Sequence, residues 1–149
     1  ESVDKVDNVK YETTVSAVLT ATTNALNAEG YKPGYAFAGW AIDNTTTKAI
    51  DIASYLITTN TTLYALWTAN TYTVYFDSNG ATGGNTEPQA FTYDAAAAAL
   101  NENGYERTGY QFLGWSTDSA ATTATYVDKA SVSNLTTTVN GTVNLDAVW

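Results

Sequence analysis

A seven-residue pattern, Gly-Tyr-x-Phe-x-Gly-Trp, occurs twice in this chain and constrains its fold more than any other feature. It spans residues 34–40 and recurs at residues 109–115, an offset of 75 residues. Each copy is followed by a strand-like segment that ends in tryptophan, at residues 63–67 and 145–149. Matched aromatic positions at such a period are typical of a repeated structural unit.

The repeats predict two tandem domains, residues 1–68 and 69–149. Upstream of the motif the two copies align with an offset of 74 residues, and downstream of it with an offset of 82. We therefore expect loops of different length on both sides of the motif.

The composition excludes several classes of chemistry. The 149 residues include no Cys, His or Met, which rules out thiolate nucleophiles, imidazole bases, disulfides and ordinary zinc sites. Fifteen acidic residues against six basic ones, a net charge of −9, argue against binding to nucleic acid or anionic membranes. No apolar run approaches the ~20 residues of a membrane span. We expect no cofactor, no metal, no catalysis and no membrane insertion.

Threonine is unusually frequent, with 27 copies, and this β-branched residue favours strands. Its abundance together with the lack of Cys favours an extracellular surface protein. The chain shows no signal peptide and does not begin with Met, so we expect it to be a piece of a longer secreted protein.

The second repeat is predicted to hold several strands and one short helix. Asp94 followed by five alanines predicts a capped helix over residues 95–100. The Asp-Ser-Asn-Gly sequence at residues 77–80 predicts a tight turn. The predicted strands are residues 72–76, 90–93, 110–115 and 144–149.

The first repeat differs at its beginning. The helical spacing of Val15, Val18, Leu19 and Leu26 predicts a helix within residues 14–27. Residues 1–8 are polar, and nothing there resembles the strand predicted at residues 72–76. The first strand of this repeat is therefore either missing or supplied by another segment.

Three ordered motifs in the second repeat, at residues 72–80, 109–115 and 147–149, resemble the internalin-type B repeat, also called the Listeria–Bacteroides repeat. The first repeat carries the last two motifs and diverges at its start. The resemblance implies an α+β fold of two β-grasp-like (ubiquitin-like) modules, each a small mixed sheet packed on one short helix. It also implies tandem copies in wall-attached surface proteins, where the modules act as stalks, sometimes contribute to adhesion and carry no catalytic residues.

The motif residues are interpreted as core anchors. Trp40 and Trp115 recur at equivalent positions beside glycines, which we expect to leave room for the indole rings. This favours burial over stacking against a sugar. Tyr31 and Tyr105, with the motif tyrosines beside them, are the candidate contacts for a glycan or protein. The predicted core and motif residues are Gly34, Tyr35, Phe37, Gly39, Trp40, Trp67, Gly109, Tyr110, Phe112, Gly114, Trp115 and Trp149.

Several other patterns have a simpler interpretation than a site. The turn at residues 77–80, with Glu87 eleventh from Asp77, resembles part of a calcium loop but lacks the intermediate ligands. Carboxylate pairs suggest glycoside chemistry, but nothing places them in a cleft, and we interpret them as solvated surface. The pairs are Glu102 with Glu106, and Asp43 with Asp51.

The sequence also offers candidates for two covalent modifications. Lys10 is the candidate for an isopeptide cross-link to a carboxyl or amide group. Four segments fit the N-glycosylation pattern, beginning at Asn44, Asn60, Asn134 and Asn140.

We therefore expect a structural repeat of an extracellular cell-surface protein, an adhesin stalk or filament, whose partners are neighbouring repeats. One alternative is an adhesion module that binds a glycan or host protein through exposed tyrosines. Another is a strand-exchange fibre, in which residues 1–8 insert into another molecule or a neighbouring chain completes the first repeat. A full sheet within the first repeat, with residues 1–8 pairing in their own repeat, would argue against that fibre.

Overall fold

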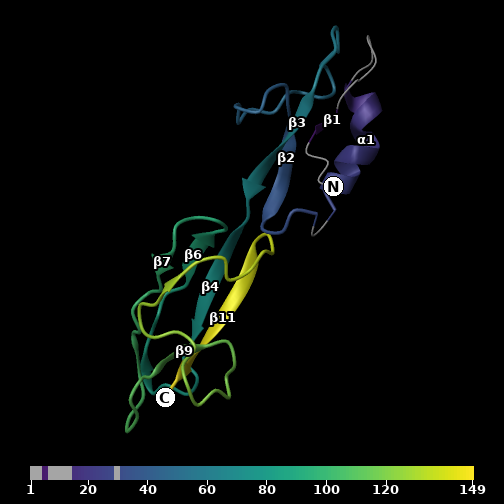
Figure 1. Cartoon of the computed structure of the whole chain (residues 1–149). Helices are drawn as coiled ribbons and strands as arrows, with labels where there is room; N and C mark the ends of the chain where they lie inside the picture. Colours follow the sequence, from purple (N-terminus) through teal and green to yellow (C-terminus); the bar gives the residue numbers. More distant parts are fainter. Residues whose placement is uncertain (1–4, 7–14, 29–30) are drawn as a thin grey trace. The chain divides into compact units, whose positions relative to one another are not determined.

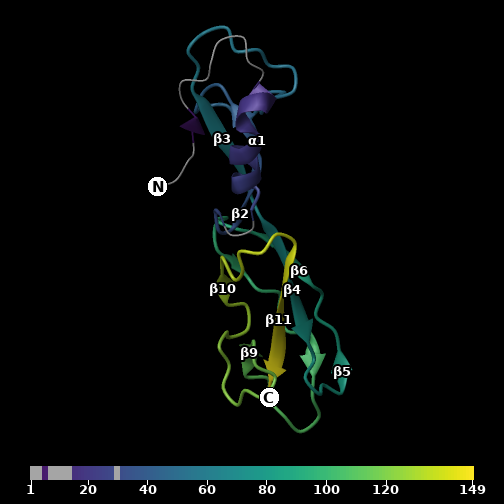
Figure 2. The ribbon, with the colours of Figure 1, turned by 90° about the vertical axis from the view of Figure 1, so that its right-hand side faces the viewer.

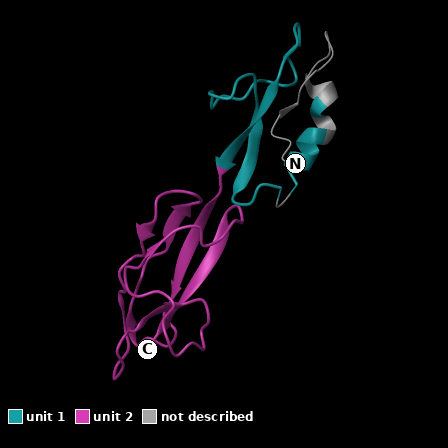
Figure 3. Ribbon diagram, in the orientation of Figure 1, with its two compact units in different colours: residues 1–68 teal, residues 69–149 magenta. Residues whose placement is uncertain are grey.

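The computed structural model describes residues 5–6, 15–28 and 31–149 of the chain. These residues form two compact units, residues 1–68 and 69–149 (Figure 3). Lys10 lies outside the described residues.

Unit 1 is a small sheet with one helix against it. Helix α1 (Val15–Leu26) lies where the helical spacing predicted it. Leu19 and Leu26 of this helix are buried together with Trp40 of the sheet, so the helix packs on the sheet (Figure 1, Figure 2). The strand order is β1 (Lys5–Val6), β3 (Leu63–Ala69), β2 (Tyr35–Ala41).

The first strand of unit 1 differs from its counterpart in unit 2. Lys5 pairs with Tyr64 and Val6 with Leu63, in antiparallel orientation. In unit 2 the corresponding neighbour of the last strand is a seven-residue parallel strand. The polar beginning of the chain thus supplies a two-residue strand to its own unit. This pairing argues against the fibre in which residues 1–8 insert into another molecule.

Unit 2 is built on a four-stranded mixed sheet. Its two central strands, β4 (Thr71–Asp77) and β11 (Gly141–Val148), run parallel from the Tyr72–Gly141 pair to the Asp77–Asp146 pair. Both outer strands are antiparallel to their neighbours. The order is β6 (Gln89–Thr92), β4 (Thr71–Asp77), β11 (Gly141–Val148), β9 (Gly114–Ser116).

Two short ladders complete unit 2. One joins β5 (Gly83–Gly84) to β8 (Tyr105–Glu106), and the other joins β7 (Ala98–Ala99) to β10 (Ser131–Val132).

The helix predicted over residues 95–100 is absent, so the prediction of one helix per module is wrong for unit 2. Ala98 and Ala99 instead pair with β10. The Gln89 side chain donates to the Ala99 carbonyl and accepts from the Asn101 amide, at 2.9 and 2.8 Å. A six-residue helix is only marginally stable by itself, and these long-range hydrogen bonds favour the extended backbone.

The strand predicted over residues 110–115 is also shorter than expected. Only Gly114–Ser116 pairs with β11. The Tyr110 amide donates to the Arg107 carbonyl at 3.0 Å, and Gly109 adopts a φ of 82°. The same turn precedes β2 in unit 1, where Gly34 also has a φ of 82°, so the turn alone does not shorten the strand. Residues 110–113 lie outside the paired strand, although the Leu113 amide still donates to the Val148 carbonyl at 2.8 Å.

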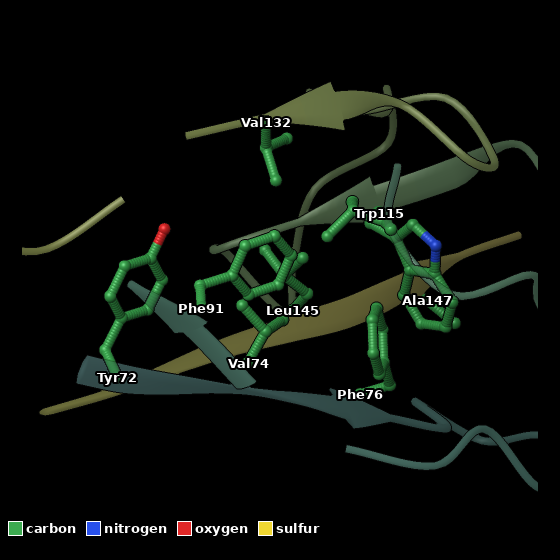
Figure 4. Close-up of a cluster of buried hydrophobic side chains, with 9 residues drawn as sticks. Tyr72, Val74, Phe76, Phe91, Trp115, Val132, Leu145 and Ala147 are labelled. Carbon is green, nitrogen blue, oxygen red and sulfur yellow. The ribbon is translucent and has the colours of Figure 1, made fainter. Parts of the chain in front are cut away.

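The two units share four buried anchor positions, although their secondary structures differ. Figure 4 shows the unit 2 core, where Trp115, Phe76 and Leu145 pack between the sheet and β10. Leu100, in extended chain, is as buried as Leu26 at the end of a helix, each 2% exposed. The equivalent buried pairs are Leu26 and Leu100, Trp40 and Trp115, Ile57 and Val132, and Leu63 and Leu145.

Candidate functional site

The tryptophans of the repeated motif are buried and present no face to a ligand. Trp40 and Trp115 are both 0% exposed. The Trp40 indole donates to the Thr23 hydroxyl at 3.0 Å, whereas the buried Trp115 Nε1 has no hydrogen-bond partner in unit 2. Each indole ring packs T-shaped with the motif phenylalanine, Trp40 with Phe37 at 5.4 Å and Trp115 with Phe112 at 4.9 Å between centroids.

The glycine before each tryptophan makes room for the returning chain, not for the indole ring as the sequence suggested. Gly114 has a φ of 136°, and a Cβ there would lie 2.3 Å from the Tyr126 carbonyl oxygen. Tyr126 exchanges backbone hydrogen bonds with Trp115, at 2.7 and 2.9 Å. Gly39 is equivalent, with a φ of 128° and Ala49 at 2.7 Å from its hypothetical Cβ.

The closing tryptophans, Trp67 and Trp149, are half-buried and repeat one geometry. Phe37 meets Trp67 with centroids 5.6 Å apart and planes at 73°. Phe112 meets Trp149 at 5.6 Å and 68°. These partly exposed rings are where the two units can offer an aromatic surface.

A basic residue lies beside each closing tryptophan, two positions before the Gly-Tyr pair. Lys32 Nζ is 4.8 Å from the Tyr35 ring centroid and 5.1 Å from that of Trp67. Arg107 Cζ is 3.9 Å from the Tyr110 ring centroid. Such distances allow cation–π attraction. Sequence reasoning missed this pair, although the same offset of 75 residues relates the two positions.

The two units differ in where the candidate tyrosines lie. Tyr31 is 37% exposed and stacks on Trp67, with centroids 5.9 Å apart and planes at 8°. Tyr105 lies in β8, where its hydroxyl donates to the Phe76 carbonyl at 2.8 Å and its ring meets Trp115 at 6.3 Å. Tyr105 is therefore drawn toward the core instead of covering Trp149.

One extra residue accounts for the difference. Five residues run from Gly30 to Gly34 and six from Gly104 to Gly109, and the longer segment lets Tyr105 enter a strand.

A pocket of about 270 Å³ lies beside Trp149 in unit 2. Tyr110, which is 59% exposed, forms part of its rim. Its lining combines aromatic rings with charged and polar side chains: Tyr105, Glu106, Arg107, Thr108, Tyr110, Phe112 and Trp149.

The turn after β4 holds this pocket in place. The Trp149 indole donates to the Ser78 carbonyl at 3.1 Å. Asn79, with a φ of 44°, donates from its amide to the carbonyls of Ala147 and Ser119 at 2.8 and 3.0 Å. The Arg107 guanidinium lies against Gly80. These contacts give the Asp-Ser-Asn-Gly segment a structural role. No cluster of three carboxylates suited to a metal ion occurs in the part of the chain that the structure describes.

Three aspartates converge elsewhere on unit 2, around an open pocket of about 740 Å³. Asp77 and Asp146 are partners across the parallel ladder, and Asp118 lies nearby. Partial burial, and then the negative charges of Asp77 and Asp118, raise the pKa of Asp146.

The carboxylate pairs noted in the sequence form local contacts. Glu102 pairs with Lys129 at 2.8 Å, and Glu106 belongs to the pocket beside Trp149. Asp43 accepts hydrogen bonds from Thr45, and Asp51 from Ser54, which lower the pKa of each carboxyl group. Asp43 and Asp51 line a shallow pocket with Ile42 and Leu56, residues about half exposed.

The asparagines of all four glycosylation patterns are exposed, and two of them take part in side-chain hydrogen bonds. Asn134 exchanges hydrogen bonds with Asp94 at 2.7 and 2.8 Å, and Asn140 accepts one from Thr71 at 3.4 Å.

Comparisons with known proteins identify relatives of both units. A family model described as the Listeria-Bacteroides repeat domain matches residues 2–66 and 72–146. A "Putative membrane protein" of Evansella cellulosilytica is 38% identical over 88 residues, which are 58% of this chain. A "Putative Gly-rich membrane protein" of the same organism is 34% identical over 120 residues, or 79% of the chain.

These matches cover 13% and 12% of the two relatives, so the chain spans about an eighth of their length. No solved structure matches it significantly. Among the described residues, no helix is long and apolar enough to cross a membrane.

Proposed function

The chain belongs to the Listeria-Bacteroides repeat family, and from this premise we propose that it is a load-bearing stalk segment of an extracellular surface protein. The family is surface-associated and typically structural, not enzymatic. Two relatives bear the name of membrane proteins, and the net charge of −9 keeps such a surface soluble. The proposed partners are neighbouring repeats in an adhesin or filament attached to the cell wall.

We further propose that both units are variants of a β-grasp-like module. The unit 2 sheet supports this, because its first and last strands lie parallel in the centre, with β6 and β9 outside them. In unit 2 extended chain replaces the helix and buries Leu100 in its place. In unit 1 the helix is kept, and Lys5–Val6 is the described part of the opening strand.

The observation that carries the stalk proposal is the parallel pairing of β4 with β11. Because the strands are parallel, the chain enters β4 and leaves β11 at opposite ends of the sheet. Seven residues of β4 give a span of about 23 Å at a rise of 3.3 Å per residue. Tension on the chain then shears the two strands along their length and loads their six paired positions together.

Single-molecule pulling in two directions tests this proposal. The chain has no Cys, so introduced cysteines give unambiguous attachment points. One variant combines Thr71→Cys with a cysteine added after Trp149, which shears β4 against β11. The control combines Thr71→Cys with Val139→Cys. Both control sites lie at the same end of the ladder, since the Asn140 amide donates to the Thr71 carbonyl at 2.8 Å.

We expect unit 2 to unfold at a force several times higher in the shearing direction than in the same-end direction. In the control the strands separate one hydrogen bond at a time. Equal forces in the two directions would overturn the load-bearing function.

A further inference from the structure

The geometry points to a sugar-binding site in unit 2, in which the pocket beside Trp149 takes one ring of a neutral polysaccharide. This goes beyond the proposed stalk function, because a stalk needs no ligand.

Unit 1 shows that a flat ring fits at this position of the fold. There Tyr31 stacks on Trp67 with the planes at 8°, and Lys32 lies over the same indole. Unit 2 has an equivalent tryptophan and an equivalent cation, but Tyr105 has moved to the core. Within unit 2, whose residues are all described, the ring that packs against Trp149 is Phe112, with the two planes at 68°. The face that Tyr31 occupies in unit 1 is thus left to the pocket in unit 2.

The rim of the pocket offers both hydrogen-bond donors and hydrogen-bond acceptors that have no partner within unit 2. The Arg107 guanidinium rests on Tyr110, and its N–H donors meet no acceptor in unit 2. The exposed Glu106 carboxylate likewise forms no ion pair or hydrogen bond in that unit. Arginine supplies up to five donors in a fixed plane, and an ionised carboxylate supplies only acceptors.

This combination fits a neutral sugar better than other flat groups. The apolar face of a pyranose can stack on an indole while its hydroxyls donate and accept around the ring. A tyrosine side chain carries one hydroxyl and would leave most of the rim unmatched. An anionic group would be drawn to Arg107 but repelled by Glu106, and the opposite holds for a cation.

The pocket volume limits the site to one ring. About 270 Å³ lies just below the usual range of small-molecule pockets. We therefore expect weak binding by a single site, with a Kd of about 1 mM, as is usual for a ligand that buries few atoms.

The test is a titration of the full chain followed by NMR, using the indole N–H signals of its four tryptophans and the Arg107 side-chain signal. The probes are cellotetraose, chitotetraose and mannotetraose. We expect at least one of them to shift the Trp149 and Arg107 signals in a saturable way, while the buried Trp40 and Trp115 signals and the covered Trp67 signal stay in place.

Three variants make the assignment specific. Arg107→Ala and Glu106→Gln should each weaken the binding at least about fivefold, since each removes hydrogen bonds to charged groups. Lys32→Ala is the matched control in unit 1 and should leave the affinity unchanged. Both pocket residues lie at the surface, and unchanged Trp115 signals verify that each variant is folded.

Four results would overturn the site. They are no shift with any probe well above millimolar concentration, equal shifts of Trp67 and Trp149, undiminished binding in both pocket variants, and a Trp149 signal that changes with protein concentration alone. The last result would assign the pocket to a side chain of a second copy. None of these results would contradict the stalk proposal, which is tested separately by comparing the unfolding forces in the two pulling directions.

Discussion

The Trp149 indole donates a hydrogen bond to the Ser78 carbonyl, 71 residues earlier in the chain. The equivalent Trp67 Nε1 in unit 1 is buried and has no partner among the described residues. The motif tryptophans show the opposite distribution. In unit 1 the Trp40 indole donates a hydrogen bond to Thr23, whereas in unit 2 the Trp115 indole has no hydrogen-bond partner. Among the described residues, each unit thus satisfies one of its two indoles, and each does so by means of a different element. In unit 1 this element is the helix, and in unit 2 it is the turn after β4.

We predict that Asn79 is a main support of that turn. Asn79→Ala removes two side-chain hydrogen bonds and places Ala at a φ of 44°. The loss should be about 3 kcal/mol in the free energy of unfolding of unit 2, from about 1 kcal/mol per hydrogen bond and about 1 for the left-handed backbone. Urea unfolding, followed by the Trp115 and Trp149 indole signals, measures it.

Asn79→Gly separates the two contributions, because glycine accepts the backbone conformation and lacks the amide. It should lose less stability than Asn79→Ala, by about 1 kcal/mol. Equal losses would show that the left-handed backbone has no cost at this position.

We predict that Gly114 is far less replaceable than Gly109, although both have positive φ angles. A Cβ at Gly114 meets the Tyr126 carbonyl oxygen at 2.3 Å and the Ala124 Cβ at 2.6 Å, whereas a Cβ at Gly109 meets nothing within 4 Å. Gly114→Ala should cost more than about 3 kcal/mol, through strain and the loss of the Trp115–Tyr126 pairing. Gly109→Ala should cost only about 1–2 kcal/mol for the backbone conformation.

The measurement is the unfolding free energy of unit 2 in each variant. A Gly114→Ala protein as stable as Gly109→Ala would show that the returning segment moves aside freely.

The residues that recur at a fixed offset show how much of the core could be predicted from the sequence. Trp40 and Trp115, as well as Leu63 and Leu145, could be matched by offset alone, and all four are buried. The strands at residues 72–76, 90–93 and 144–149 followed from local patterns, since β-branched and aromatic residues alternate there or form short apolar runs.

Other features depend on contacts that no local pattern contains. The alanines at residues 95–99 have high helix propensity, but hydrogen bonds from Gln89 and from β10 hold their segment extended. The pocket depends on one extra residue before Gly109, which moves Tyr105 away from Trp149. Arg107 was not predicted as a site residue, because a single cation does not form a recognisable motif. Its match to Lys32 at an offset of 75 residues could have indicated it.

We predict that unit 2 gains stability on mild acidification because of Asp146. Its folded-state pKa is raised, so the folded unit binds a proton before the unfolded chain does. The gain therefore develops as the pH falls through the raised folded-state pKa and is complete below the unfolded value near 3.8. At neutral pH the repulsion from Asp77 and Asp118 is fully present.

Asp146→Asn removes that repulsion and should stabilise unit 2 at pH 7. The advantage over the unmodified protein should shrink as the pH approaches 3.8. Unfolding free energies at several pH values, read from the Trp115 and Trp149 signals, test this. An advantage that stays constant with pH would exclude Asp146 as its source.

Unit 1 should respond in the opposite direction. Hydrogen bonds lower the folded-state pKa values of Asp43 and Asp51, so their contribution is present above the unfolded value of 3.8 and is lost as the pH falls through the lowered values. The Trp40 and Trp67 signals should therefore report a loss below pH 3.8. Asp43→Asn with Asp51→Asn should weaken this dependence, and an unchanged profile would contradict it.

The last prediction concerns Thr23, which joins the helix of unit 1 to its core. Thr23→Val keeps the shape and the β-branched character of the side chain but leaves the buried Trp40 Nε1 without its acceptor at 3.0 Å. A buried donor left unsatisfied costs about 1–3 kcal/mol, so the unfolding free energy of unit 1 should fall by that amount.

Thr22→Val is the matched control, since Thr22 lies in the same helix and makes no such bond to Trp40. It should change the stability of unit 1 by less than about 0.5 kcal/mol, as is usual for substitutions away from special contacts. The Trp40 indole proton should also exchange with solvent faster in Thr23→Val alone. Equal effects of the two substitutions would mean that helix propensity, and not the bond to Trp40, makes Thr23 important.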